Sequence, residues 1–283
     1  MHPLRLLSTA YLTALLISFN FVMPDTVNPD SETPGLNVVR ITPAGKDVPS
    51  GRQIVIEFNR AVVPVGRMER NAAEVPITIL PEVDCQWRWL NTRALACQLD
   101  ENAALKPATR YDVVVKLGIK TEDGTTLTDP VVHWFITERP KVRHAWFRTW
   151  KAPGMPFIRL TFNQPVLGES VEKHVFMMTD APDKQRIGLK VEPDPDDKQT
   201  PIILPLPGEK IALVPDKSSN DRSGSVTETS PEDHKTAARR VWLISPEVEI
   251  APDTQVTLKV TPGLVSFSGP ERGVENRVLV VFH

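Results

Sequence analysis

The residues of this chain that could do chemistry are few, and they match no known catalytic pattern. The 283 residues contain no GxSxG, HExxH, GxGxxG or P-loop sequence. The six histidines are scattered singly, without an i, i+4 pair that could hold a metal. We therefore predict no catalytic residue, no cofactor and no metal site. A hydrolase would need a cluster of His, Asp and Ser that the sequence does not reveal.

Two cysteines form the first candidate site. Cys85 and Cys97 bracket the segment QWRWLNTRALA, which has Asn91 at its midpoint. A hairpin that turns at Asn91 would place Cys85 opposite Cys97 and Trp89 opposite Arg93, with all four side chains on one face. In an oxidising compartment two opposed cysteines form a disulfide, which is the pairing that we predict. Two free buried thiols and a metal pair are the alternatives, and the absence of matching histidines disfavours the metal.

Two tryptophans form the second candidate site. Trp146 and Trp150 lie in RHAWFRTWKAPG, beside Arg143, Arg148 and Lys151. An exposed aromatic pair next to cations could bind a sugar or a peptide. Because the segment lies where two halves of the chain meet, packing at a domain junction is the plainer interpretation.

A short acidic run forms the third. The carboxylates of Asp194, Asp196 and Asp197 could bind calcium, which prefers clustered carboxylate oxygens. The glycine and the distal glutamate of a calcium loop are missing, so a solvated loop is the favoured interpretation.

The N-terminal segment has the composition of an export signal. Arg5 precedes an uncharged apolar run over 6–23, although no small-residue pair marks a cleavage site. Residues 1–24 are thus predicted to be a signal peptide or, if uncleaved, an inner-membrane anchor, followed by a linker over 25–35. A buried N-terminal helix is the third possibility. The net charge of −2 provides no field for nucleic acid, and membrane contact is expected only through this segment.

Three blocks of sequence occur twice in the same order, which predicts an internal duplication. IVIEFNRAV resembles IRLTFNQPV, LKPATRYDVVVKLGI resembles IAPDTQVTLKVTPGL, and VVHWFIT resembles RVLVVFH. In the first block the alternating apolar residues predict strands with one buried face: Ile54, Ile56 and Phe58 in the first copy, and Ile158, Leu160 and Phe162 in the second.

The elements that carry these residues are short strands joined by turns. The chain has 27 prolines and 14 glycines, and proline breaks helices. We predict an all-β chain of two tandem immunoglobulin- or fibronectin-like antiparallel β-sandwiches, over 36–139 and 140–283, preceded by the signal or anchor helix. The second copy is longer because of a polar inserted loop at about 192–240.

The segment ITPAGKDVPSGRQIVIEFNRAVVPVG, the LKPATRYDVVV…DGTTL block and the final ENRVLVVF resemble the N-terminal region of bacterial α2-macroglobulins. The resemblance covers about residues 36–283. It implies a periplasmic or envelope protein of a protease-trapping family, in which a thioester forms in a C-x-E-Q motif. Here Gln86 and Gln98 follow the two cysteines outside such a motif, so no thioester residue carries over. A full family member would be several times longer, which suggests a fragment without the bait and thioester regions.

Two functions follow from these patterns. The first is a non-enzymatic scaffold of an α2-macroglobulin-like endopeptidase inhibitor. The resemblance implies that its partners are downstream macroglobulin domains, target proteases and cell-wall synthesis proteins. The alternative is an immunoglobulin-like envelope binding module for a glycan, a peptide or a partner protein, since sandwiches carry such sites on their exposed surfaces.

Overall fold

The computed structural model describes residues 35–63, 69–70, 75–180, 184–197, 202–203 and 237–282. The predicted signal or anchor at 1–24, nearly all of the linker at 25–35 and most of the insertion at 192–240 lie outside these residues. In the part that is described, no helix is long and apolar enough to cross a membrane.

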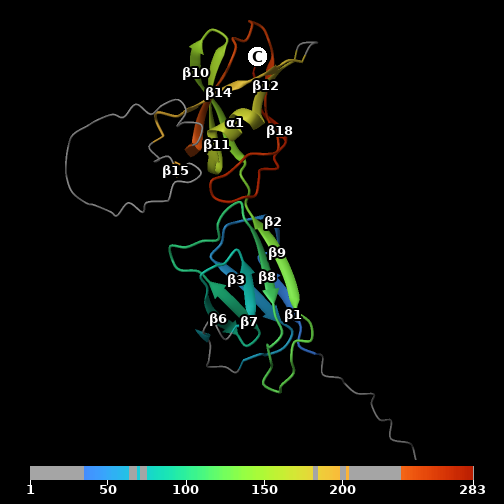
Figure 1. Ribbon diagram of the computed structural model, residues 1–283. Helices are drawn as coiled ribbons and strands as arrows, with labels where there is room; N and C mark the ends of the chain where they lie inside the picture. Colours follow the sequence, from blue (N-terminus) through green and yellow to red (C-terminus); the bar gives the residue numbers. More distant parts are fainter. Residues whose placement is uncertain are drawn as a thin grey trace, which may run out of the picture. The chain divides into compact units, whose positions relative to one another are not determined.

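The chain is all-β, and it forms two tandem immunoglobulin-like sandwiches whose named strands pair antiparallel, except for the parallel pair β2–β9. The first, coloured blue to green in Figure 1, pairs β1-β3-β7-β6-β4 in one sheet and β2-β9-β8-β5 in the other. Its strands are β1 (Val38–Thr42), β2 (Gly45–Val48), β3 (Gln53–Phe58), β4 (Glu69–Arg70), β5 (Ile77–Leu80), β6 (Gln86–Asn91), β7 (Ala94–Gln98), β8 (Arg110–Val115) and β9 (Val131–Thr137).

The second sandwich, coloured yellow-green to red in Figure 1, pairs β10-β11-β16-β14 in one sheet, with β15 on β16, and β13-β12-β17-β18 in the other. Its elements are β10 (Val142–Ala152), β11 (Met155–Leu167), α1 (Gly168–His174), β12 (Val175–Thr179), β13 (Arg186–Ile187), β14 (Leu189–Pro193), β15 (Ile202–Ile203), β16 (Ala237–Pro246), β17 (Val256–Val260) and β18 (Arg277–Phe282).

The two sandwiches repeat one strand order, β1-β3-β7-β6 in the first and β10-β11-β16-β14 in the second. The opposing sheets repeat it as well, with β9-β8-β5 matched by β18-β17-β12. The three duplicated blocks lie on the equivalent strands β3 and β11, β8 and β17, and β9 and β18. The duplication that the sequence predicts is therefore also a duplication of topology.

Each core is built from the alternating residues of the central strands. The first block supplies six buried side chains, three to each core: Ile54, Ile56, Phe58, Ile158, Leu160 and Phe162. They pack against the buried valines and leucine of the facing strands, Val113 and Val115 in the first core and Leu258 and Val260 in the second. Because successive strand residues point to opposite faces, this burial leaves Val55, Glu57, Arg159 and Thr161 on the outer faces.

The second block repeats its backbone conformation as well as its side chains. Ala108 and Asp253, at matched positions, both have positive φ angles, of 48° and 55°. Gly118 and Gly263, also matched, have φ angles of 117° and 125°. The surroundings of the two glycines differ, because a Cβ on Gly118 would meet only Pro76, at 3.9 Å, whereas a Cβ on Gly263 would overlap the imidazole ring of His174.

We expect Gly263→Ala to destabilise the chain more than the matched control Gly118→Ala. Both variants impose a positive φ on alanine, at a cost of about 1–3 kcal/mol. Only Gly263→Ala also forces the ring of His174 to move, which adds about 1–3 kcal/mol of overpacking. Urea unfolding of the three proteins measures the difference, with hydrogen exchange assigning each transition to one sandwich. Equal losses in the two variants would contradict this account of the packing.

Candidate functional site

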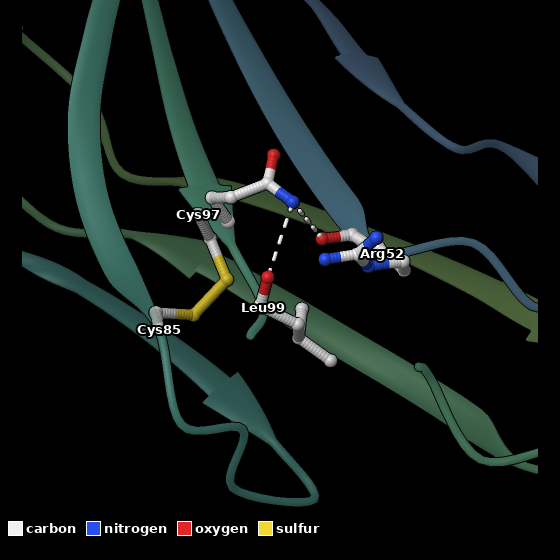
Figure 2. The surroundings of a disulfide bond; sticks show 5 residues. Arg52, Cys85, Cys97 and Leu99 are labelled. Atoms are coloured by element: carbon white, nitrogen blue, oxygen red, sulfur yellow. Dashed lines mark hydrogen bonds between the residues drawn. A yellow bond between two sulfur atoms is a disulfide. The ribbon is translucent and has the colours of Figure 1, made fainter. Parts of the chain in front are cut away.

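The two cysteines form a disulfide, as the sequence predicts, although not in the predicted register. Figure 2 shows the bond, with Cys85 just before β6 and Cys97 in β7. Their Cα atoms lie 4.9 Å apart. The side-chain amide of Gln98, the residue after Cys97, donates to the carbonyl oxygens of Arg52 and Leu99, 3.1 and 3.2 Å away, which ties β7 to the start of β3.

The predicted pairing of the hairpin is wrong by two residues. Cys97 lies opposite Trp87, and Trp89 lies opposite Leu95, so the disulfide runs diagonally. The reason is local: the side chain of Asn91 accepts a hydrogen bond from the backbone N–H of Arg93 at 2.8 Å, and the register shifts between Trp89 and Asn91. A shift of two residues leaves Trp87, Trp89, Leu95 and Cys97 on one shared face, as predicted, whereas a shift of one would reverse the faces.

We expect the double variant Cys85→Ser, Cys97→Ala to have a free energy of unfolding about 2–3 kcal/mol lower than that of the wild-type chain. The bond closes a short loop, with a sequence separation of 12, and such loops give stabilisation of this size. Urea unfolding with and without reductant measures it. Reductant should destabilise the wild-type chain by a similar amount and leave the double variant unchanged. A variant as stable as the oxidised wild type would contradict the prediction.

The two candidate tryptophans are exposed, so the prediction that they pack at a domain junction is wrong. Their exposed fractions are 61% for Trp146 and 57% for Trp150. They also do not form a pair, because Trp146 lies opposite Arg159 on β11 while Trp150 lies opposite the buried Pro156. Along β11 the even-numbered residues are buried and the odd-numbered ones lie outside, so the two rings lie on opposite faces of β10.

Each tryptophan has its own aromatic neighbour. The ring of Trp150 lies 5.4 Å from the ring of Phe147, and the ring of Trp146 lies 5.8 Å from the ring of His144, measured between centroids. Only Trp146 belongs to a polar hollow on the outer face of the sheet.

This hollow has a volume of about 600 Å³ and is lined by charged and aromatic side chains. Phe147 borders it as well, and we call the other five lining residues the Trp146 surface: Trp146, Arg148, Arg159, Asp194 and Asp196. β10 supplies Trp146 and Arg148, β11 supplies Arg159, and the turn after β14 supplies the two aspartates. Strand pairing through β16 therefore brings together segments that are far apart in the sequence.

Asp194 is the buried centre of this surface, so the prediction of a fully solvated loop is wrong for this residue. Its side chain has no exposed area. Arg148 Nη1 donates to its Oδ1 over 2.6 Å, and Arg159 Nε lies 2.6 Å from its Oδ2. The backbone N–H of Asp196 donates to Oδ1 at 3.0 Å. The side chain of Asp196 is 74% exposed and accepts a hydrogen bond from Nη2 of Arg148.

The electrostatics of the surface keep both members of the main ion pair charged. Burial by itself would raise the pKa of Asp194, but the N–H of Asp196 and the guanidinium of Arg148 outweigh it and hold the pKa below its ordinary value of 3.8. The hydrogen bond to Asp194 in turn raises the pKa of Arg148. Because Arg148 and Arg159 already contact the two oxygens of the buried carboxylate, it is not available to coordinate calcium. Among the described residues, no group of three or more His, Cys, Asp or Glu could hold a metal ion.

We expect Asp194→Asn to destabilise the chain at neutral pH, because it leaves Arg148 and Arg159 without their shared counter-ion. The folded-state pKa of Asp194 lies below the ordinary 3.8, so its ionised form stabilises the fold above that value, and this contribution is lost as the pH falls through the folded-state pKa. The difference in the free energy of unfolding between the variant and the wild type should therefore be steady from about pH 7 to pH 5 and become smaller below about pH 4. Urea unfolding across this range measures it.

The matched control is Asp196→Asn, since Asp196 contacts the same arginine from an exposed position. Its effect on stability should be smaller, because exposed ion pairs contribute little. A pH-independent difference for Asp194→Asn, or an equal effect of both variants, would contradict the account of the buried pair.

Comparisons with known proteins leave the family open. No family model matches the chain, and no curated protein is similar to it. Among solved structures, L,D-transpeptidase 3 from Mycobacterium tuberculosis aligns at 13% identity and a TM-score of 0.24, over 54% of this chain and 74% of that chain. An L,D-transpeptidase from Mycobacterium smegmatis aligns at 11% identity and a TM-score of 0.26, over 55% and 74%.

A third solved structure, the S-layer protein rSbsC, aligns at 11% identity and a TM-score of 0.23, over 82% of this chain and 53% of that chain. At these levels of identity and superposition, none of the three alignments carries information about the activity of this protein.

Proposed function

We propose that this chain is a non-catalytic scaffold of a bacterial α2-macroglobulin-like envelope protein, a family whose members trap proteases. The main support for the scaffold role is the oxidised state of the two cysteines. The chain has two cysteines, and both are in the Cys85–Cys97 disulfide. Neither can supply the thiolate that a thioester needs, so this chain would act by holding other domains rather than by capturing a protease.

The carboxylates support a non-catalytic role as well. Hydrogen bonds from Arg139 lower the pKa of Asp47, and those from Lys141 lower the pKa of Glu138. The pKa of Asp194 is lowered as well, so all three carboxylates favour their ionised form. A general acid or base works best with a pKa near the operating pH, and these shifts move the groups away from it.

The disulfide also supports a location. Disulfides persist in oxidising compartments such as the periplasm and are rare in the cytosol. An exported chain that carries this bond fits the periplasm or cell envelope, where macroglobulin domains and target proteases would be its partners.

We expect the purified chain to capture no protease covalently. Trypsin, papain and thermolysin are incubated with it, and the products are examined by denaturing electrophoresis and intact mass, with a thioester-containing macroglobulin as the positive control. Proteolytic nicking without a conjugate is the expected result, because no thioester can form. A conjugate that survives denaturation and reduction would contradict the scaffold role.

The Cys85→Ser, Cys97→Ala variant is the negative control in the same assay, because it has no thiol that could form a thioester. The wild type and the variant should give the same products, without a conjugate. In the cell, crosslinking followed by mass spectrometry should join the chain to macroglobulin domains with a C-x-E-Q motif. Crosslinks to other envelope proteins alone would contradict the family relation while leaving the scaffold role untouched.

A further inference from the structure

The fold does not require the Trp146 surface, as its counterpart in the first sandwich shows. Trp146 faces Arg159 across the β10–β11 pair. At the equivalent place in the β1–β3 pair, Thr42 faces Val55. The same strand geometry therefore tolerates two small side chains, and the second copy carries an indole and a guanidinium instead.

Both copies have a hollow on this outer face, but the linings differ. The hollow of the first sandwich, about 770 Å³, is lined by Thr42, Val55 and the Arg40–Glu57 ion pair, among others. Phe58 borders it but is buried in the core. A concavity with charged residues over these strands is thus a property of the fold, whereas the exposed indole of Trp146 and the buried carboxylate of Asp194 are particular to the second copy.

The exposed ring lies beside polar groups whose positions are already fixed. The side chain of Arg148 is held by Asp194 and Asp196, and that of Arg159 by Asp194. A ligand would meet these groups without having to order them first, which lowers the entropic cost of binding. An aromatic platform with a few convergent polar groups is the usual composition of a small-ligand site, and a volume of about 600 Å³ is in the usual range.

The charges of the hollow select against ionic ligands. The two arginines and two aspartates give a formal sum of zero, and each charge already has an opposite partner. An anionic ligand would displace or be repelled by the carboxylates, and a cationic ligand would meet the arginines. Nucleic acid is disfavoured for the same reason, because phosphate binding needs uncompensated cations.

What the hollow does offer is a mixture of donors and acceptors beside an apolar ring. A guanidinium has five N–H donors, and the contacts of Arg148 with the aspartates leave some of them for a ligand. The exposed carboxylate of Asp196 has free acceptor capacity. A ligand that suits this set is neutral, has an apolar face for the indole, and carries hydroxyl groups that both donate and accept.

We propose that Trp146, Arg148, Arg159 and Asp196 form a binding site for one or two pyranose rings of a neutral glycan. The C–H face of one sugar ring stacks on the indole of Trp146. Its hydroxyl groups accept hydrogen bonds from the two guanidinium groups and donate to the carboxylate of Asp196. Asp194 touches no sugar and positions the arginines. This site goes beyond the scaffold function and does not depend on the macroglobulin relation.

Ligand-observed saturation-transfer NMR on the full chain tests the proposal, because it detects weak binding. The neutral probes are cellotetraose, maltotetraose and chitotetraose, and the anionic comparison is tetragalacturonate. We expect at least one neutral tetrasaccharide to bind, and tetragalacturonate to bind at least tenfold more weakly than the best of them.

The matched control is on the same strand. Trp146→Ala should weaken binding of the best neutral probe at least tenfold, because the stacking platform is lost. Trp150→Ala removes an equally exposed ring from the opposite face of β10 and should leave binding unchanged. Urea unfolding of both variants shows whether each is folded. If Trp146→Ala fails to fold, Asp196→Asn replaces it, with at least a threefold loss of binding expected.

Several results would overturn the proposal. One is the absence of binding to every neutral tetrasaccharide at millimolar concentration. Others are equal losses in the two tryptophan variants, or a preference for tetragalacturonate. Binding of an extended peptide library that depends on Trp146 while no glycan binds would assign the surface to a protein partner instead. None of these results would bear on the absence of protease capture, so the two proposals fail separately.

Discussion

The burial of one face of each central strand is the constraint on which the rest of this structure depends. In β11 every second residue from Pro156 to Val166 is buried, and β3 repeats the pattern over its shorter length. Apart from Pro156 and the polar Gln164, these residues belong to the apolar cores that hold the two sheets of each sandwich together through the hydrophobic effect. The period of two then places the intervening residues outside, where they are free to differ between the copies.

The two copies differ in the residues on the outer faces of these strands. In the first copy the exposed positions of β1 and β3 carry small side chains and a surface ion pair, Arg40–Glu57. In the second, β10 is longer and carries exposed aromatic rings, and the turn after β14 supplies a buried carboxylate. A buried charge is costly in free energy unless it is paired, so Asp194 needs both arginines. The same ion pairs fix the positions of Arg148 and Arg159. The arginines on this face are therefore ordered, while the tryptophan beside them is exposed.

The two proposed functions of the chain use different groups. The proposed scaffold function depends on groups that the fold already uses, since the disulfide takes both cysteine thiols and the ion pairs hold their carboxylates in the charged form. The proposed glycan site depends on groups that the fold leaves exposed, namely the indole of Trp146 and the N–H groups of Arg148 that its aspartate partners do not use. A non-catalytic envelope protein can contain both, because neither uses the groups of the other.

The sequence by itself determined the all-β class, the duplication, the core residues of the repeated strands and the partnership of Cys85 with Cys97. These follow from local periodicity, which depends only on residue type and spacing. The sequence also placed Trp87 and Trp89 on the correct face of the hairpin. The predicted register was wrong by two residues, and a shift of two residues leaves each side chain on the same face of the strand.

Only the tertiary structure decided three points. Trp146 and Trp150 point to opposite faces because the β10–β11 register shifts between Phe147 and Thr149, and such an irregularity changes the period of two. Asp194 is buried because two arginines reach it from other strands, a contact that an acidic run does not reveal. Arg159 joins the surface through the pairing of β10 with β11. All three points depend on strand register and on pairing between segments distant in the sequence. Neither can be read from the order of residues along a single strand.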